Sequence, residues 1–149
     1  MKHGLKPQLQ LSPRHRAAIQ DAAAAAYPNE CCGLLVGEGD EVVTVTEVVP
    51  TANTADDPRR AFAIDPQEQF NLLRATRGPL ENGKSRRVVG HYHSHPDGSA
   101  APSRHDLAMA YDPEALWVVV ATSREGASPP RAFCRPEGAD TFVEIELIA

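Results

Sequence analysis

The first alternation of hydrophobic and polar positions along the chain predicts a short strand followed by a helix. Leu9 and Leu11 alternate with polar residues, which is typical of a short edge strand. Ser12-Pro13 then supplies an N-cap and a first helical residue. The Ala-rich segment after it predicts a helix to about Tyr27, because Ala has the highest helix propensity and Pro28 stops the helix.

Two apolar runs predict the next strands. Residues 29–37 form a short run bounded by glycines, typical of a buried strand, and residues 41–49 are rich in Val and Thr. The turn residues between the two runs predict that they pair as a hairpin. After a polar loop, residues 61–64 predict a further short strand.

Helix caps and further apolar runs predict the rest of the fold. Asp65-Pro66 begins a second helix, whose Phe70 and Leu73 are expected to face the core. A third helix of about two turns is predicted to begin at Ser103. Four further strands are predicted, at residues 88–95, 117–122, 131–135 and 141–148.

The order of these elements predicts an α/β (α+β) fold, with a mixed sheet of about six to eight strands and about three helices. The chain has 149 residues, of which 42% are hydrophobic and 23% charged, as is usual for a globular protein. It contains no internal repeat and no linker-like segment. We therefore expect a single domain over residues 1–149.

Charge and cysteine content narrow the class of protein. A formal net charge of −5 argues against nucleic acid as the main partner, because phosphate binding relies on clustered Lys and Arg. The cysteines, Cys31, Cys32 and Cys134, are few and odd in number, which favours a reducing compartment. No apolar run reaches the roughly 18 residues of a membrane span, and the start does not resemble a signal peptide. We therefore expect a cytoplasmic protein with no membrane partner.

Candidate chemistry is concentrated in residues 88–110, which hold four of the six histidines. His93 and His95 are two residues apart and therefore share one face of a predicted strand. Two imidazoles at this spacing suit Zn²⁺, and Asp106 near the start of the next helix is a candidate third ligand. Three protein ligands with a fourth position left for water are typical of a catalytic zinc site.

Some of these residues have a second interpretation. Ser103 and Asp106 form Ser-x-x-Asp, which is close to a capping box, so both can serve only to satisfy the end of the helix. His91 and His105 lie close enough in sequence to compete as metal ligands. The residues alone leave these alternatives open.

Taken together, these residues resemble the JAMM motif of the MPN-domain metalloproteases. The resemblance rests on Glu30, on His93-Ser94-His95-Pro96 and on Ser103-x-x-Asp106, and it extends to residues 29–37 and to Gly90. His91 stands where the family often has an aromatic residue. The resemblance implies an MPN/JAB-like fold, similar to the cytidine-deaminase-like architecture, and the stand-alone prokaryotic branch of the family.

The resemblance also implies a role for each residue. His93, His95 and Asp106 are expected to bind one Zn²⁺, and Glu30 to act as general base and then as general acid. Ser103 is expected to donate a hydrogen bond to the carbonyl oxygen of the substrate as negative charge develops on it. Ser94 is expected to support the geometry of the metal ligands without contacting the metal itself.

The implied activity is hydrolysis of a peptide or isopeptide bond after the C-terminal Gly-Gly of a ubiquitin-like or sulfur-carrier protein. The tail is expected to add as a strand near residues 50–60 or 80–87. The alternatives are a non-catalytic MPN scaffold module and a deconjugating peptidase of a bacterial defence system. A zinc deaminase is disfavoured, because the chain has no Pro-Cys-x-x-Cys segment.

Overall fold

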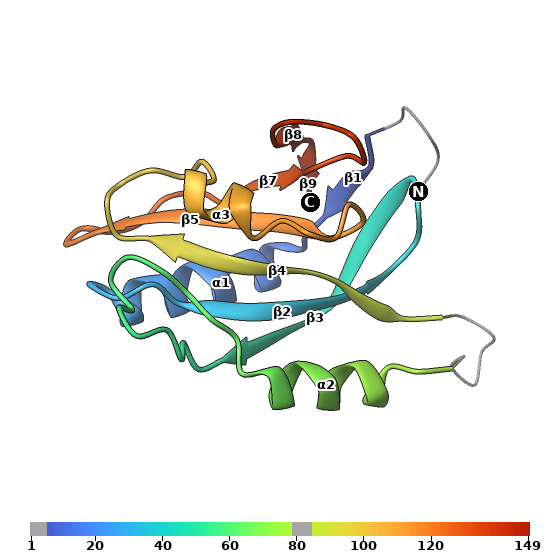
Figure 1. Cartoon of the computed structure of the whole chain (residues 1–149), viewed down its shortest axis with the longest axis horizontal. Coiled ribbons are helices and arrows are strands. Elements are labelled where there is room, and N and C mark those ends of the chain that lie inside the picture. The colour runs from blue at the N-terminus through green and yellow to red at the C-terminus, as the bar shows by residue number, and fades with distance from the viewer. Residues whose placement is uncertain (1–5, 79–84) are drawn as a thin grey trace.

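A mixed β-sheet organises the protein, as a computed structural model that describes residues 6–78 and 85–149 shows (Figure 1). These two ranges contain three helices and nine strands. In chain order the elements are β1 (Gln8–Gln10), α1 (Pro13–Ala26), β2 (Cys32–Glu38), β3 (Val42–Thr51), α2 (Pro66–Ala75), β4 (Arg87–His95), α3 (Arg104–Ala108), β5 (Leu116–Ser123), β6 (Gly126–Ala127), β7 (Arg131–Cys134), β8 (Val143–Ile145) and β9 (Leu147–Ile148). The strand order is β8-β7-β5-β4-β2-β3-β1-β9, with β6 paired to β5 outside this row.

Strand β4 lies at the centre of the sheet, between β2, which is antiparallel to it, and β5, which is parallel. Gly90 permits this close packing, because a Cβ there would collide with the carbonyl oxygen of Leu116 on β5. β5 is buried along its whole length except for Ser123, as its continuous apolar run predicts.

The two faces of the sheet are covered differently. α1 packs Ile19 and Ala23 into a core with Leu35, Tyr92 and Val118. Ser12 caps this helix, since its hydroxyl oxygen accepts from the N–H of His15 at 3.2 Å. α1 lies behind the sheet in Figure 1 and α3 lies in front of β5. The front face carries a second apolar cluster, and the histidines of β4 project toward it.

The predicted architecture is confirmed: a mixed sheet with three helices, in which β2 and β3 pair as a hairpin. Three details differ. β1 is not an edge strand, because β9 pairs with it on the outside. The expected loop after β5 contains the short β6, and the expected strand over residues 141–148 is divided into β8 and β9.

Two predictions are wrong, one about residues 61–64, which precede α2, and one about α2 itself. Residues 61–64 form no strand and make only one bridge, between Asn53 and Ile64, because Ala61 and Ala63 bind to the side chain of Asn53 instead. Phe70 and Leu73 do not face the core; they are 52% and 48% exposed, because α2 buries none of its residues. α3 is also shorter than expected, with five residues.

None of the helices within residues 6–78 and 85–149 is long and apolar enough to cross a membrane.

Candidate metal centre

His93 and His95 lie at the end of β4 and project from the same face of the sheet. His93 has no exposed surface and His95 is 6% exposed. Pro96 follows directly and cannot donate to a ladder of strand hydrogen bonds, so β4 ends at this point. The end of the strand therefore holds two buried imidazoles next to each other.

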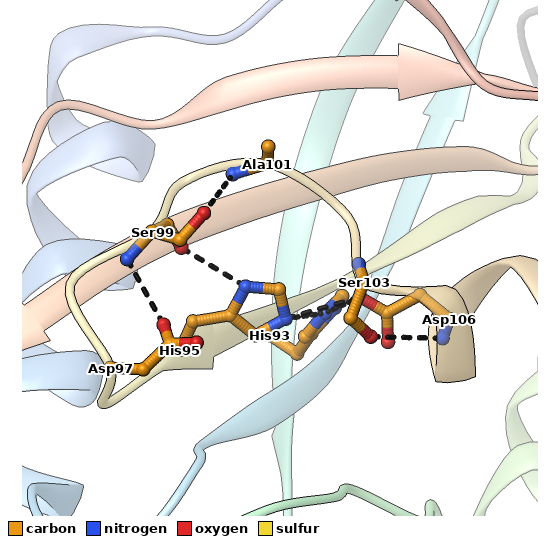
Figure 2. Close-up of polar contacts among 7 residues, drawn as sticks. All are labelled: His93, His95, Asp97, Ser99, Ala101, Ser103 and Asp106. Carbon is orange, nitrogen blue, oxygen red and sulfur yellow. Dashed lines mark hydrogen bonds and ion pairs between the residues drawn. The ribbon is translucent and has the colours of Figure 1, made fainter.

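Asp106 is brought to these rings by the first turn of α3. The Asp106 N–H donates to Ser103 Oγ at 3.0 Å, and the Ser103 N–H donates to Asp106 Oδ2 at 2.8 Å, which is a complete capping box. The same Oδ2 atom lies 3.1 Å from Nε2 of His93 and 3.1 Å from Nε2 of His95 (Figure 2). The capping box predicted as a purely structural alternative is thus present, and it also holds the carboxylate against both histidines.

Three potential ligand atoms converge on one point. The Nε2 atoms of His93 and His95 are 3.0 Å apart, and with Asp106 Oδ2 they form a nearly equilateral triangle. Ligand atoms around a tetrahedral Zn²⁺ with bonds of roughly 2.0–2.1 Å stand about 3.3 Å from one another. The spacing of the three atoms therefore fits a small divalent ion.

The tautomer of His95 strengthens this fit. Its Nδ1 lies 3.0 Å from the carbonyl oxygen of Ser99, which can only accept, so Nδ1 carries the proton (Figure 2). Nε2 is then the atom that faces Asp106 Oδ2. In the metal-free protein it can donate a proton to the carboxylate, and a bound cation would replace that proton and use the lone pair of Nε2 instead.

The charges of the centre follow from burial and from these contacts. Burial lowers the pKa of His93, so its ring is neutral and able to act as a ligand. Burial also opposes charge on Asp106, but the hydrogen bonds from His93 and His95 outweigh it and hold the pKa of the carboxyl well below its usual range. For His95 burial acts against protonation, and the hydrogen bond and charge of Asp106 more than offset it, so its pKa is raised.

Glu30 reaches the centre from the segment directly before β2. The register that pairs Cys32 with His93 puts Glu30 beside His95, and its carboxylate lies within 4.8 Å of a ring nitrogen of each histidine. Glu30 is 5% exposed, and burial raises its pKa to about 7, with the nearby Asp106 adding to the effect and His95 opposing it. A carboxyl poised near neutral pH can take and return a proton, and it is also close enough to be a ligand.

The two serines named from the sequence occupy different places. Ser103 uses its oxygen to accept from the backbone of α3, which leaves the hydrogen of its hydroxyl group able to donate. Ser94 is fully buried, and its Oγ accepts from the N–H of Cys31 at 2.8 Å. Ser94 therefore binds to the residue that follows Glu30.

His91 and His105 do not join the group. Among the described residues, the ligand atoms of Glu30, His93 and His95 lie within 4.8 Å of one another, and those of His93, His95 and Asp106 within 3.1 Å; neither set includes His91 or His105. His91 packs edge-on against Trp117, with ring centroids 4.2 Å apart, and burial lowers its pKa to about 3. His105 is exposed on α3.

Sequence reasoning missed three residues that surround the centre, namely Asn53, Phe62 and Trp117. Phe62 stacks on the ring of His93, and Trp117 meets that ring edge-on. Asn53 donates to the carbonyl oxygen of Glu30 at 3.0 Å. Only long-range packing brings these residues together, and no spacing in the sequence signals it.

A groove of about 470 Å³ extends along β4 beside the centre. Its lining includes His91 of β4, Trp117 of β5, Leu73 of α2, and Met109 at the end of α3. Leu73 and Met109 are 48% and 49% exposed. The groove is therefore lined by both apolar and polar residues and includes His91, whereas Glu30, His93, His95 and Asp106 are not part of its lining.

Residues 12–135 match the family of prokaryotic homologs of the JAB domain, and the chain belongs to this family. This confirms the family resemblance that the motif indicates. The match includes all the residues of the centre.

Three relatives bear the names of enzymes of this class. The chain is 35% identical over 127 residues to the desampylase of Haloferax volcanii, and the match covers 85% of this chain and 86% of the relative. It is 31% identical over 123 residues to the CysO-cysteine peptidase of Mycobacterium bovis, covering 82% and 79%. It is 35% identical over 120 residues to the probable TtuB-protein conjugate cleaving protease of Thermus thermophilus, covering 79% and 70%. The homologues are thus JAMM-type peptidases that remove conjugated groups.

Two solved structures share the fold. A protein from Desulfitobacterium hafniense matches with a TM-score of 0.77 at 30% identity, covering 94% of this chain and 91% of that one. A JAB1/MPN domain protein from Archaeoglobus fulgidus matches with a TM-score of 0.54 at 22% identity, covering 95% and 99%. The second likeness supports the MPN/JAB-like fold alone.

Proposed function

We propose that this protein is a zinc peptidase that hydrolyses the peptide or isopeptide bond after the C-terminal Gly-Gly of a ubiquitin-like or sulfur-carrier protein. The proposal rests on the convergence of the Nε2 atoms of His93 and His95 and the Oδ2 atom of Asp106 on one point. The carboxylate of Glu30 lies within 4.8 Å of a ring nitrogen of each histidine. The peptidase relatives give the class of bond.

His93, His95 and Asp106 would hold the ion in preference to Glu30. The pKa of Asp106 lies far below neutral and that of Glu30 is about 7, so the Asp106 carboxylate is charged throughout the physiological range. A ligand must be deprotonated, whereas a general base must exchange its proton near the working pH. When bound, Zn²⁺ supplies Lewis-acid chemistry, which polarises a carbonyl group and lowers the pKa of water from about 15.7 to about 7.

The residues of the chain carry the proton and stabilise the developing charge. Glu30 accepts a proton from the attacking water and then delivers it to the amine that leaves, so the same carboxyl serves as base and acid. Ser103 donates its free hydroxyl proton to the carbonyl oxygen as negative charge develops there. Loss of one such donor typically costs about 2.7–4 kcal/mol of barrier.

The groove beside the centre offers a path for the tail of the carrier. An extended Gly-Gly tail is narrow, and in the groove its apolar upstream residues would contact Leu73 and Met109. The loop over residues 50–60 reaches Glu30 through the carbonyl oxygen of Pro58, so it flanks the centre on the side of the base. The other loop expected to contact the tail comprises residues 80–87. Its residues 80–84 lie outside the described part of the chain.

The test is cleavage of defined carriers. The protein is incubated with each ubiquitin-fold carrier of its own genome, fused after Gly-Gly to a short peptide, and the products are read by intact mass. We expect cleavage after the second glycine by the wild type, and loss of turnover with retained zinc in Glu30→Gln. A zinc-loaded wild type that cleaves none of these fusions contradicts the proposal and favours a scaffold role.

A further inference from the structure

His93 lacks the hydrogen bond that usually orients a metal-binding histidine. The Nδ1 atom of His95 donates to the carbonyl oxygen of Ser99, but Nδ1 of His93 is buried and has no partner among the described residues. A histidine ligand normally donates its other ring N–H to a carboxylate, a carbonyl or water, and this fixes the ring. Some other contact must therefore orient the ring of His93.

Phe62 supplies that contact. Its ring stacks on the imidazole of His93, with centroids 4.3 Å apart and an interplanar angle of 21°. Trp117 meets the same imidazole edge-on at 5.8 Å and 81°. Two aromatic side chains thus contact the ring of His93 from adjacent sides, one stacked on its face and one edge-on, and both geometries are of kinds that aromatic rings prefer.

Phe62 belongs to a segment without regular secondary structure, and one side chain fixes it. Asn53 Nδ2 donates to the carbonyl oxygen of Ala61 at 3.0 Å, and Asn53 Oδ1 accepts from the N–H of Ala63 at 3.1 Å. These are the two residues on either side of Phe62. The amide of Asn53 therefore clamps the backbone around the aromatic ring.

The same amide also holds the residue proposed as the base. Asn53 Nδ2 donates to the carbonyl oxygen of Glu30 at 3.0 Å, and the N–H of Glu30 donates to Pro58 in the same loop at 2.7 Å. One side chain is therefore bonded to the backbone of Glu30 and to both neighbours of Phe62.

We propose that Asn53 and Phe62 are positioning residues that act as one unit, in which Asn53 fixes Phe62 and Glu30 together and Phe62 orients His93 for metal binding. The inference rests on the proposed function for its use of the metal. Stacking takes the place of the missing hydrogen bond on one ligand, whereas the other ligand, His95, keeps its hydrogen bond to Ser99.

The first experiment compares Phe62→Leu and Phe62→Tyr with Phe142→Leu. Phe142 is a matched control, because it packs in the same cluster against Trp117 at 4.9 Å and makes no ring contact with His93 among the described residues. Zinc affinity is measured by competition with a chelator. We expect Phe62→Leu to weaken zinc binding about 10–100-fold, as loss of a group that orients a ligand does, and both Phe62→Tyr and Phe142→Leu to stay near wild type.

A second readout needs no metal. In zinc-free protein, the stacked ring of Phe62 should shift the NMR signals of the His93 ring protons upfield, and Phe62→Leu should remove this shift. Equal zinc affinity in Phe62→Leu and wild type, or an unchanged His93 signal, overturns the inference. If wild type binds no zinc but shows the shift, the proposed function fails and the orientation of His93 by Phe62 stands.

The unit formed by Asn53 and Phe62 is tested by combining variants. Asn53→Ala is compared with Thr54→Val, which removes a side-chain hydrogen bond to Ala63 in the same loop but touches neither Glu30 nor Ala61. We expect Asn53→Ala to weaken zinc binding and Thr54→Val to leave it unchanged. The double variant Asn53→Ala with Phe62→Leu should bind zinc no more weakly than the worse single variant, because both changes disrupt one contact. Fully additive losses would overturn the coupling between the two residues.

Discussion

The backbone N–H of Cys31 donates a hydrogen bond of 2.8 Å to Ser94 Oγ, and the N–H of Ser94 donates one of 3.2 Å to the carbonyl oxygen of Cys31. Cys31 directly follows Glu30, and Ser94 lies between His93 and His95. This pair of hydrogen bonds therefore sets the distance between the carboxyl of Glu30, which lies just before β2, and the two imidazoles of β4.

Ser94→Ala removes one of these two hydrogen bonds. The N–H of Cys31 loses its acceptor in a partly buried place, which costs on the order of 1 kcal/mol of folding free energy. We expect lower stability in denaturant titration and a lower kcat, with zinc content retained. Ser123→Ala is the matched control, because Ser123 also accepts from a backbone N–H, that of Glu125 at 3.1 Å, but on the exposed surface. Equal kcat in Ser94→Ala and wild type would contradict this role.

The sequence predicted the parts of the centre that local spacing encodes. His93 and His95 share a face because strand side chains alternate, and Asp106 stands at a helix start that a capping box marks. The position of Glu30, about sixty residues earlier, came only from the family resemblance. No local rule places it beside His95, because that position depends on the register between β2 and β4.

The errors have the same origin. The apolar spacing of α2 predicts that Phe70 and Leu73 face a core, yet no other element covers that side of the helix among the described residues. Residues 61–64 have the composition of a strand, but the amide of Asn53 takes the hydrogen bonds that a neighbouring strand would have made. In both cases a tertiary relationship decided the outcome.

Asp106→Asn tests the proposal that Asp106 is a metal ligand. The amide keeps an oxygen that can accept from the N–H of Ser103, so α3 should stay capped, but it lacks the charge that favours a cation. We expect zinc affinity to fall by at least about tenfold, measured by chelator competition, with little change in helix content by circular dichroism. Asp65→Asn is the control, because Asp65 caps α2 through the N–H of Gln67 and lies outside the centre. Equal losses in both variants would mean that Asp106 acts only as a cap.

Zinc-free protein should show the raised pKa of Glu30 in its stability. The carboxyl titrates near pH 7 in the folded state and near 4.5 in the unfolded state, so between these values the folded state holds the extra proton. Stability from this group is therefore present below about pH 4.5 and is lost as pH rises toward 7, by about 3 kcal/mol in all. Glu30→Gln removes this loss.

The measurement is the unfolding free energy of wild type and Glu30→Gln in EDTA at several pH values. We expect the unfolding free energy of the variant to rise relative to that of wild type from pH 4.5 to 7, and the difference to stay constant at higher pH. Asp106 adds little to this difference, because its lowered pKa keeps its carboxyl ionised in the folded state of both proteins over this pH range. Parallel stability curves would show that the pKa of Glu30 is not raised.

The groove along β4 gives a prediction for substrate binding that is independent of the metal. Leu73→Glu puts a charge on the wall of the groove, where an apolar segment of the carrier tail would have to desolvate it. We expect KM for a Gly-Gly fusion to rise about tenfold or more, with kcat and zinc affinity near wild type. Phe70→Glu is the matched control, because Phe70 lies on the same helix, is 52% exposed and does not line the groove. If both substitutions raise KM equally, the tail or the body of the carrier contacts the exposed face of α2 rather than the groove; if neither does, the tail reaches His93 and His95 from the side of residues 50–60.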